Sequence, residues 1–192
     1  MTYQITAIFI LAAFYGIYLA KLVIQKRRSI RTNQVGIGNK PRRVRIIEQV
    51  MSVATVLACF AAVCSIFCVK GYPAQGMRAA GAVSGIAAVF VFAMATGAMK
   101  DSWRVGIPEE KTELITNGIY KYSRNPAFVG FDLLYLSMNL MFFNIPLALI
   151  SVWAAVMLHL QILQEEVHMQ KMFGEDYDEY RRHTMRYFGK RK

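Results

Sequence analysis

Acidic residues are scarce in this 192-residue chain: 12 Asp and Glu stand against 23 Lys and Arg, which gives a formal net charge of +11. So basic a chain is first compared with nucleic-acid-binding proteins. Its basic residues, however, cluster between long apolar runs and form no stripe with interleaved aromatic side chains. We therefore expect no nucleic-acid partner and attribute the positive charge to membrane topology.

Cysteine is also rare, and the three present all lie in one apolar run, as Cys59, Cys64 and Cys68. An odd number of cysteines inside such a run argues against a disulfide framework. Cys64 and Cys68 share a helix face, but no His or carboxylate accompanies them. We therefore predict no metal site.

Long apolar runs are the dominant feature, because the chain is 55% hydrophobic with a mean hydropathy of +0.31. This is more apolar surface than one small soluble core can hide. Several runs approach the ~20 helical residues that cross a hydrocarbon layer of about 30 Å. These runs are Tyr3–Ile24, Ile46–Val69, Ala79–Met99, Pro126–Phe143 and Ile145–Leu163. The sequence predicts an all-α, polytopic membrane bundle with about five transmembrane helices.

The orientation of the bundle follows from its loops. Lys and Arg gather in the first loop, between Lys21 and Arg45, whereas the second loop holds only Lys70 and Arg78. The positive-inside rule then places the N-terminus outside and the C-terminus in the cytoplasm. The first run lacks a basic segment before it and a small-residue cleavage pattern, so we expect a retained span.

The fourth and fifth runs are separated only by Asn144, with Pro146 shortly after it, which predicts an antiparallel helical hairpin. Their cytoplasmic ends should then be neighbours in space. After the fifth run, Gly174 is typical of a helix C-cap, and Glu175–His183 should form a short amphipathic helix. In the third run, Gly81 to Gly85 is a small-residue pattern typical of close helix packing.

The segment 101–124 carries turn signals between the third and fourth runs. Asn117-Gly118, flanked by apolar residues, predicts a tight turn or a small hairpin. Directly after this segment, Asn125 is a favoured N-cap and Pro126 a favoured first helical residue, so the fourth helix should begin there.

The start of the fourth helix is a candidate anion site. The first backbone N–H groups of a helix lack intrahelical acceptors and point at its end. The residues concerned are Ala127, Phe128 and Val129. Gly130 lets a ligand or a neighbouring backbone come close. By the hairpin argument, the pair Glu165-Glu166 lies beside this end. A ligand with one anionic end and a cationic or hydroxyl-rich part would satisfy both.

Three stretches of the C-terminal half form an ordered series: Trp103–Ile107, Leu114–Pro126, and Glu165-Glu166 followed by Phe173-Gly174-x-x-Tyr177-x-x-Tyr180. As a set they resemble the isoprenylcysteine carboxyl methyltransferase and phospholipid N-methyltransferase superfamily of membrane enzymes. The similarity covers about Trp103 to Phe188. We expect residues 1–100 to form three N-terminal spans and 101–192 the cofactor-binding region of one integrated domain.

The resemblance implies S-adenosylmethionine as the cofactor, bound in a cytoplasmic pocket. It also implies a small or lipid-like hydrophobic acceptor that arrives through the membrane, of the isoprenylcysteine carboxylate, phospholipid amine or thiol type. In that family a Gly-x-Tyr-x-x-x-Arg-His-Pro motif and a Glu-Glu motif bracket the cofactor. The matching cofactor residues here are Tyr120, Arg124, Asn125, Pro126, Glu165 and Glu166, together with Ala127, Phe128 and Gly130 of the same helix start. Arg186 would handle the acceptor, and Glu165 would take the proton of an amine acceptor.

Two departures from the family pattern stand out. Asn125 replaces the usual His, a variant that is common in bacterial members of the family. We expect the location to be a bacterial inner membrane. The tail reads Arg186-Tyr187-Phe188-Gly189 and lacks the frequent final Pro. The first departure removes any imidazole-based role, and the second loosens the placement of Arg186.

Two other function classes remain open from the sequence. The first is an NADPH-dependent reductase of the steroid and sterol type, whose phosphates would need the cations Arg104, Lys111, Lys121 and Arg124. The small size of the chain argues against it. The second is a membrane scaffold or small transporter with a polar path formed by Asp132, Asn139, Asn144, His159 and Gln161.

Overall fold

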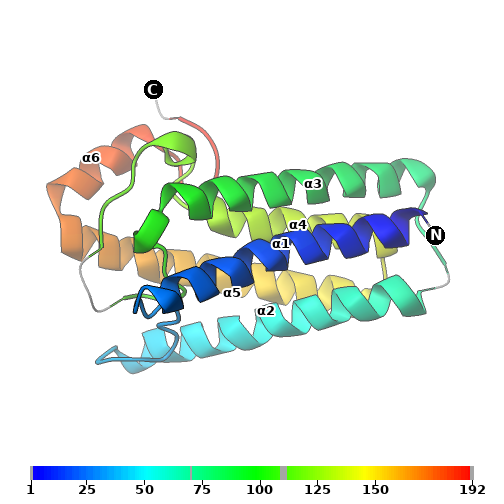
Figure 1. Cartoon of the computed structure of the whole chain (residues 1–192), viewed down its shortest axis with the longest axis horizontal. Coiled ribbons are helices and arrows are strands. Elements are labelled where there is room, and N and C mark those ends of the chain that lie inside the picture. The colour runs from blue at the N-terminus through cyan, green and yellow to red at the C-terminus, as the bar shows by residue number, and fades with distance from the viewer. Residues whose placement is uncertain (1, 70, 109–111, 191–192) are drawn as a thin grey trace.

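The structure is a computed structural model that describes residues 2–69, 71–108 and 112–190. These residues form a helical bundle (Figure 1). The helices are α1 (Thr2–Arg27), α2 (Arg42–Cys68), α3 (Gln75–Ala98), α4 (Pro126–Phe142), α5 (Ile145–Phe173) and α6 (Glu175–His183), with 3₁₀ turns η1 (Lys100–Ser102) and η2 (Gly118–Lys121). The predicted all-α architecture is confirmed.

Four of the helices, α1, α2, α3 and α5, are long and apolar enough to cross a membrane, and α4 is a shorter apolar helix. Large apolar side chains on them remain exposed, such as Phe9, Phe60 and Phe90 at 64–70%. Lipid would cover these side chains, as expected for a polytopic membrane protein.

The two ends of the bundle differ (Figure 1). The N-terminus and the α4–α5 turn lie at one end, whereas the α1–α2 loop, the segment between α3 and α4, and α6 lie at the other. We call the second the polar end. Every long charged segment of the described chain is at this end, so it is where a water-soluble ligand would approach.

The most extensive helix contact of the described chain is between α3 and α4, and small residues allow it. A Cβ atom on Gly81 would lie 2.7 Å from Met141 Cγ and 2.9 Å from the Ser137 carbonyl oxygen. The Ser137 hydroxyl donates to the Gly81 carbonyl at 2.7 Å. A Cβ on Gly85 would lie 2.6 Å from Ile10 of α1. The predicted small-residue pattern therefore serves packing.

The α4–α5 connection is the predicted antiparallel hairpin. The Asn144 side chain accepts a hydrogen bond from the Leu147 backbone N–H at 3.0 Å and donates to Ser65 of α2 at 2.8 Å. At the other end of α5, Gly174 adopts a positive φ of 53° and separates α5 from α6. Both boundaries agree with the sequence prediction.

The hairpin considered for segment 101–124 does not form in its described part. Gly118, with φ +59°, opens the 3₁₀ turn η2, which leads directly to the start of α4. The backbone of the segment pairs instead with the α1–α2 loop, through an isolated parallel bridge between Asn33 and Val105. A tight turn was thus correctly predicted, but its strand partners were not, because they lie far away in the sequence.

Candidate active site

A cavity opens at the polar end of the bundle. Its lining residues come from the segment after α3, from the start of α4, from the end of α5 and from α6. They include Trp103, Gly106, Ile107, Ile115, Tyr120, Arg124, Asn125, Ala127, Phe128, Glu165, Glu166, His168, Met169, Tyr177 and Tyr180. We call this the polar-end cavity. The start of α4 and the acidic end of α5 therefore meet, as the hairpin argument predicted.

The start of α4 differs in detail from the prediction. Pro126 occupies the first helical position, but the Asn125 side chain makes no capping hydrogen bond. Its Nδ2 donates instead to the Arg186 carbonyl oxygen at 3.1 Å. The Val129 N–H donates to the Asn125 carbonyl at 3.2 Å, so only the N–H groups of the preceding turn are left to face a ligand. Ala127 and Phe128 of that turn line the cavity.

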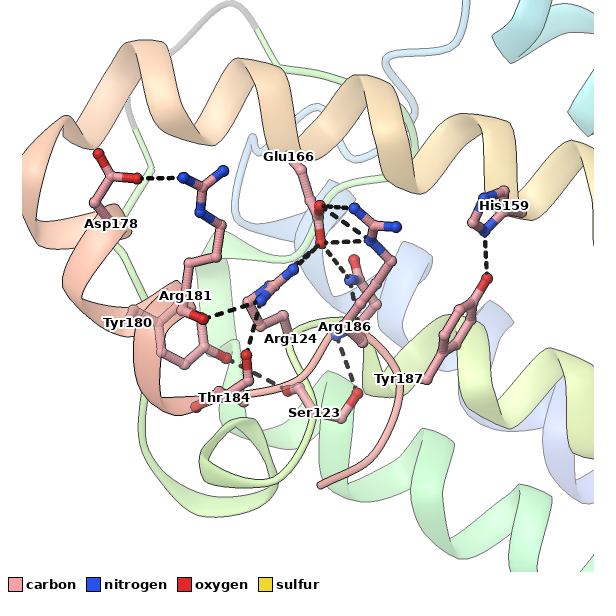
Figure 2. A network of polar contacts seen from close by, with 11 residues as sticks. Ser123, Arg124, His159, Glu166, Asp178, Tyr180, Arg181, Thr184, Arg186 and Tyr187 are labelled. Carbon is pink, nitrogen blue, oxygen red and sulfur yellow. Dashed lines mark hydrogen bonds and ion pairs between the residues drawn. The ribbon is translucent and has the colours of Figure 1, made fainter. Parts of the chain in front are cut away.

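Glu166 joins three parts of the chain through two arginines (Figure 2). Arg124 Nη2 lies 2.7 Å from Glu166 Oε1, and Arg186 Nη2 lies 2.7 Å from Glu166 Oε2. Arg124 Nη1 also donates to the Thr184 carbonyl at 2.7 Å. The hydrogen bonds that the Arg186 guanidinium donates to the Glu166 carboxylate raise the pKa of Arg186 further above its ordinary value. Through these ion pairs, Glu166 of α5 links the chain after α6 to the start of α4.

Glu165 has different surroundings, although it is the next residue. Its Oε1 accepts a hydrogen bond from Gln161 Nε2, one turn earlier on α5, at 3.0 Å. The half-buried Glu165 side chain lines the polar-end cavity and also a second cavity described below. Both adjacent carboxylates line the polar-end cavity, but Glu166 is paired with two arginines, whereas Glu165 is hydrogen-bonded to a neutral glutamine.

Three tyrosines line the polar-end cavity near α6: Tyr120, Tyr177 and Tyr180. The Tyr180 hydroxyl donates to the Tyr120 carbonyl oxygen at 2.7 Å. Burial raises the pKa of the Tyr120 and Tyr180 hydroxyls, and burial together with the nearby Glu166 raises that of Tyr177 to about 12. All three phenols are therefore protonated at neutral pH, and they act as neutral hydrogen-bonding groups.

A second cavity, of about 600 Å³, lies between α1 and α2 and is mostly apolar. We call it the apolar cavity. Its lining includes Tyr15, Tyr18, Leu19, Met51, Ser52, Thr55, Val56, Cys59, Phe60 and Phe131. It borders the polar-end cavity along a shared wall, whose residues line both cavities. The shared-wall residues are Trp103, Arg104, Gly106, Ala127, Phe128 and Glu165.

Three predicted site residues do not line the polar-end cavity. Pro126 is buried at the start of α4, and the Arg186 guanidinium is paired with the Glu166 carboxylate. Gly130 faces α3, because a Cβ there would lie 3.1 Å from Phe92 Cβ and 3.3 Å from the Ala88 carbonyl oxygen. Gly130 therefore admits a neighbouring helix and not a ligand.

Sequence reasoning missed His168, which lines the cavity. Its Nε2 is buried and has no hydrogen-bond partner within the described part of the chain. The lining residues of α1 and α2 were missed as well. The one signal for them is a row of small polar residues, Ser52, Thr55 and Cys59, along one side of α2.

Of the four cations of the reductase alternative, Arg104 and Arg124 line the polar-end cavity, whereas Lys121 does not. Arg124 is paired with Glu166, and Lys121 lines a separate surface groove with residues of α6. Arg104 lies at the shared wall, and Lys111 lies outside the described residues. Among the described residues, the polar-end cavity thus offers a dinucleotide phosphate Arg104 and the already paired Arg124, and not Lys121.

The polar residues of the transporter alternative mostly form local hydrogen bonds. Asn139 Nδ2 donates to Ser151 Oγ of α5 at 2.9 Å, and His159 Nδ1 lies 2.5 Å from the Tyr187 hydroxyl (Figure 2). Gln161 is bonded to Glu165, and Asn144 caps α5. Asp132 differs, because its Oδ1 is buried without a partner among the described residues.

The fold and the two cavities define a helical membrane protein in which a polar cavity adjoins an apolar one. The family profile of phospholipid methyltransferases matches residues 77–176, which is more than half of the chain. The chain therefore belongs to the phospholipid methyltransferase family and is a membrane methyltransferase. A search of curated proteins found no match. The matched range begins in α3, so α1 and α2 precede it.

Proposed function

We propose that this chain transfers a methyl group from S-adenosylmethionine to a lipid-like acceptor taken from the bilayer. The observation that supports this proposal is the shared wall between the two cavities. A displacement reaction needs its reacting atoms about 3–3.5 Å apart and in line. A water-soluble donor in the polar-end cavity and an apolar acceptor in the other cavity would meet at this wall.

The residues of the polar-end cavity fit the chemistry of adenosylmethionine. The α4 start, with Ala127 and Phe128, suits the carboxylate of the donor. Glu165 suits its cationic groups, and the unpartnered His168 Nε2 suits a ribose hydroxyl or a base nitrogen. Ile115 and Met169 offer apolar surface to the adenine. When bound, the cofactor supplies an electrophilic methyl group on a sulfonium.

Glu165 favours an amine or another uncharged nucleophile as the acceptor. Two charged side chains line both cavities, Glu165 and Arg104, and the Arg104 guanidinium donates to the Asp101 and Trp103 carbonyls. A carboxylate acceptor would have to draw Arg104 away from these carbonyls while standing beside the like charge of Glu165, whereas an amine would find in Glu165 a group that can hold its proton. Within the family range of acceptors, this favours the phospholipid amine over the isoprenylcysteine carboxylate.

The proposal includes an orientation in the membrane. The polar end would face the cytosol, where adenosylmethionine is made, and the N-terminus would lie outside. An inner membrane of a bacterium is the proposed location. In this arrangement residues 1–100 mainly form the acceptor side, and residues 101–192 mainly form the cofactor side.

Calorimetric titration of the purified chain with adenosylmethionine tests the proposal. The wild type should bind, and Glu165→Gln should weaken binding by about tenfold or more, because a charged hydrogen-bonding partner is lost. Glu179→Gln, an exposed position on α6, is the matched control and should bind as the wild type does. Equal affinity of Glu165→Gln, or thermal protection by NADPH but not by adenosylmethionine, would contradict the proposal.

A further inference from the structure

The wall of the polar-end cavity includes a segment without regular secondary structure, residues 103–107, which the first two helices hold in place. Gln25 of α1 donates from Nε2 to the Trp103 carbonyl at 3.1 Å. Further along, the Gln34 N–H donates to the Val105 carbonyl at 2.8 Å, and the Val105 N–H donates to the Thr32 carbonyl at 3.0 Å. The cavity wall is therefore fastened to the α1–α2 loop.

Glu48 of α2 is the fully buried centre of this contact, with 0% of its surface exposed. Its Oε1 accepts the Ile107 N–H at 2.8 Å, and its Oε2 accepts the Gly36 N–H at 2.7 Å. Lys40 Nζ lies 2.8 and 2.9 Å from the two oxygens and is itself buried. Each Glu48 carboxylate oxygen thus accepts a hydrogen bond from a different backbone N–H, while the Lys40 ammonium balances the negative charge of the carboxylate.

The backbone of residues 103–107 packs closely against the Glu48 carboxylate at Gly106. Gly106 adopts φ +83°, and a Cβ there would lie 3.1 Å from Glu48 Oε1 and 3.1 Å from the Val35 nitrogen. Only glycine allows this conformation and this closeness. Gly106 is also a shared-wall residue, and Ile107 lines the polar-end cavity. The position of Glu48 therefore fixes the position of backbone that faces the ligand.

We propose that Glu48 is a positioning residue for the cofactor cavity, holding the Gly106–Ile107 wall at the place where the methyl donor binds. Glu48 precedes the family match at residues 77–176, so this part of the site is supplied by the N-terminal helices. The inference rests on the proposed function. A merely structural role is the competing explanation, because breaking a buried ion pair destabilises many proteins.

The test compares Glu48→Gln with the double variant Lys40→Met/Glu48→Gln in the full chain. A glutamine offers one acceptor oxygen where the carboxylate offers two, so one backbone N–H loses its partner in both variants. The double variant removes the uncompensated Lys40 charge and should recover most of the lost thermal stability. Arg28→Gln is the matched control, because Arg28 pairs with Asp101 just before the same segment but on the surface.

Three signals are read in each variant: thermal stability, adenosylmethionine affinity by calorimetry, and tryptophan emission. The chain has two tryptophans, and Trp153→Phe, at a lipid-facing position of α5, leaves Trp103 as the reporter. Trp103 is 5% exposed and packs edge-on against Tyr18 and Phe92, so its emission reports the wall without any ligand. All variants are made in this background.

We expect Glu48→Gln to shift the Trp103 emission and to raise the dissociation constant of adenosylmethionine about tenfold. In the double variant both changes should persist although the stability returns, whereas Arg28→Gln should match the wild type. Recovery of affinity and emission together with stability overturns the inference, as does a Glu48→Gln protein that binds and emits like the wild type. If the wild type itself binds no adenosylmethionine, the proposed function is wrong, and the inference falls with it.

Discussion

Replacing Glu166 by Gln should destabilise the protein much more than a surface charge change does. Glu166 carries the only carboxylate that the structure places between Arg124 and Arg186 within the described residues. The Arg124 side chain is 4% exposed, and that of Arg186 is 37% exposed. After the substitution Arg186 can turn toward water, whereas Arg124 stays buried with an uncompensated charge.

The magnitude follows from that difference in exposure. Removing one partner of a buried ion pair costs about 3–5 kcal/mol, and since Arg186 can be rehydrated, we take the lower end, about 3 kcal/mol. In a chain of this size, 1 kcal/mol corresponds to about 2–4 °C in the melting temperature. The expected fall for Glu166→Gln is therefore about 6–12 °C.

Thermal unfolding in detergent, followed by helical circular dichroism, measures this fall. Arg181→Gln is the control, because Arg181 pairs with Asp178 at 3.0 Å with its side chain 52% exposed, and it should change stability by less than about 0.5 kcal/mol. Equal melting temperatures for Glu166→Gln and Arg181→Gln would refute the idea that Glu166 fastens α4, α5 and the tail together.

Further substitutions test the packing and the acceptor side. Gly81→Ala should destabilise the bundle by about 1–3 kcal/mol, because its Cβ would meet the Ser137 backbone. Gly16→Ala, with open space around it, should be neutral or slightly stabilising in thermal unfolding. Equal stabilities of the two variants would refute the close α3–α4 contact. Thr55→Phe should narrow the apolar cavity and lower kcat/KM for the lipid acceptor about tenfold, while the affinity for adenosylmethionine stays unchanged. Val53 does not line that cavity, so Val53→Phe should have no effect on kcat/KM. Full activity of Thr55→Phe would remove the acceptor from this cavity.

Much of the fold could be predicted because local signals specify it. Each apolar run became a helix. Gly174 marked the end of α5 as a C-cap, and Asn144 with Pro146 marked its start. The meeting of α4 and α5 at the polar end followed from the short connection between them. Such features need only neighbouring residues and the membrane thickness as inputs.

The different hydrogen-bonding partners of Glu165 and Glu166 could not be predicted in the same way. Successive helix residues point about 100° apart, so two adjacent carboxylates face different surroundings. Which of them meets the arginines depends on where the chain after α6 returns, and this is a tertiary contact. For the same reason Asn125, a good N-cap in isolation, turns its side chain to the Arg186 carbonyl.

The role of the first two helices at the site was also beyond local reasoning. Glu48 contacts Ile107 across 59 positions of sequence, and no motif near Glu48 indicates this contact. The apolar cavity likewise is lined by residues of α1, α2 and α4, which are far apart in the sequence. Contacts between residues distant in the sequence therefore decide the parts of the site that the periodic pattern leaves open.

Transfer of an isotope-labelled methyl group tests the central claim most directly. The full chain in phospholipid vesicles is incubated with adenosylmethionine carrying a deuterated methyl group, and the extracted lipids are analysed by mass spectrometry. We predict a labelled methyl group on an amine-bearing lipid with the wild type, and much less label with Glu165→Gln and with Thr55→Phe. Absence of label from the lipid fraction of the wild type across amine, carboxylate and thiol acceptors would contradict the account.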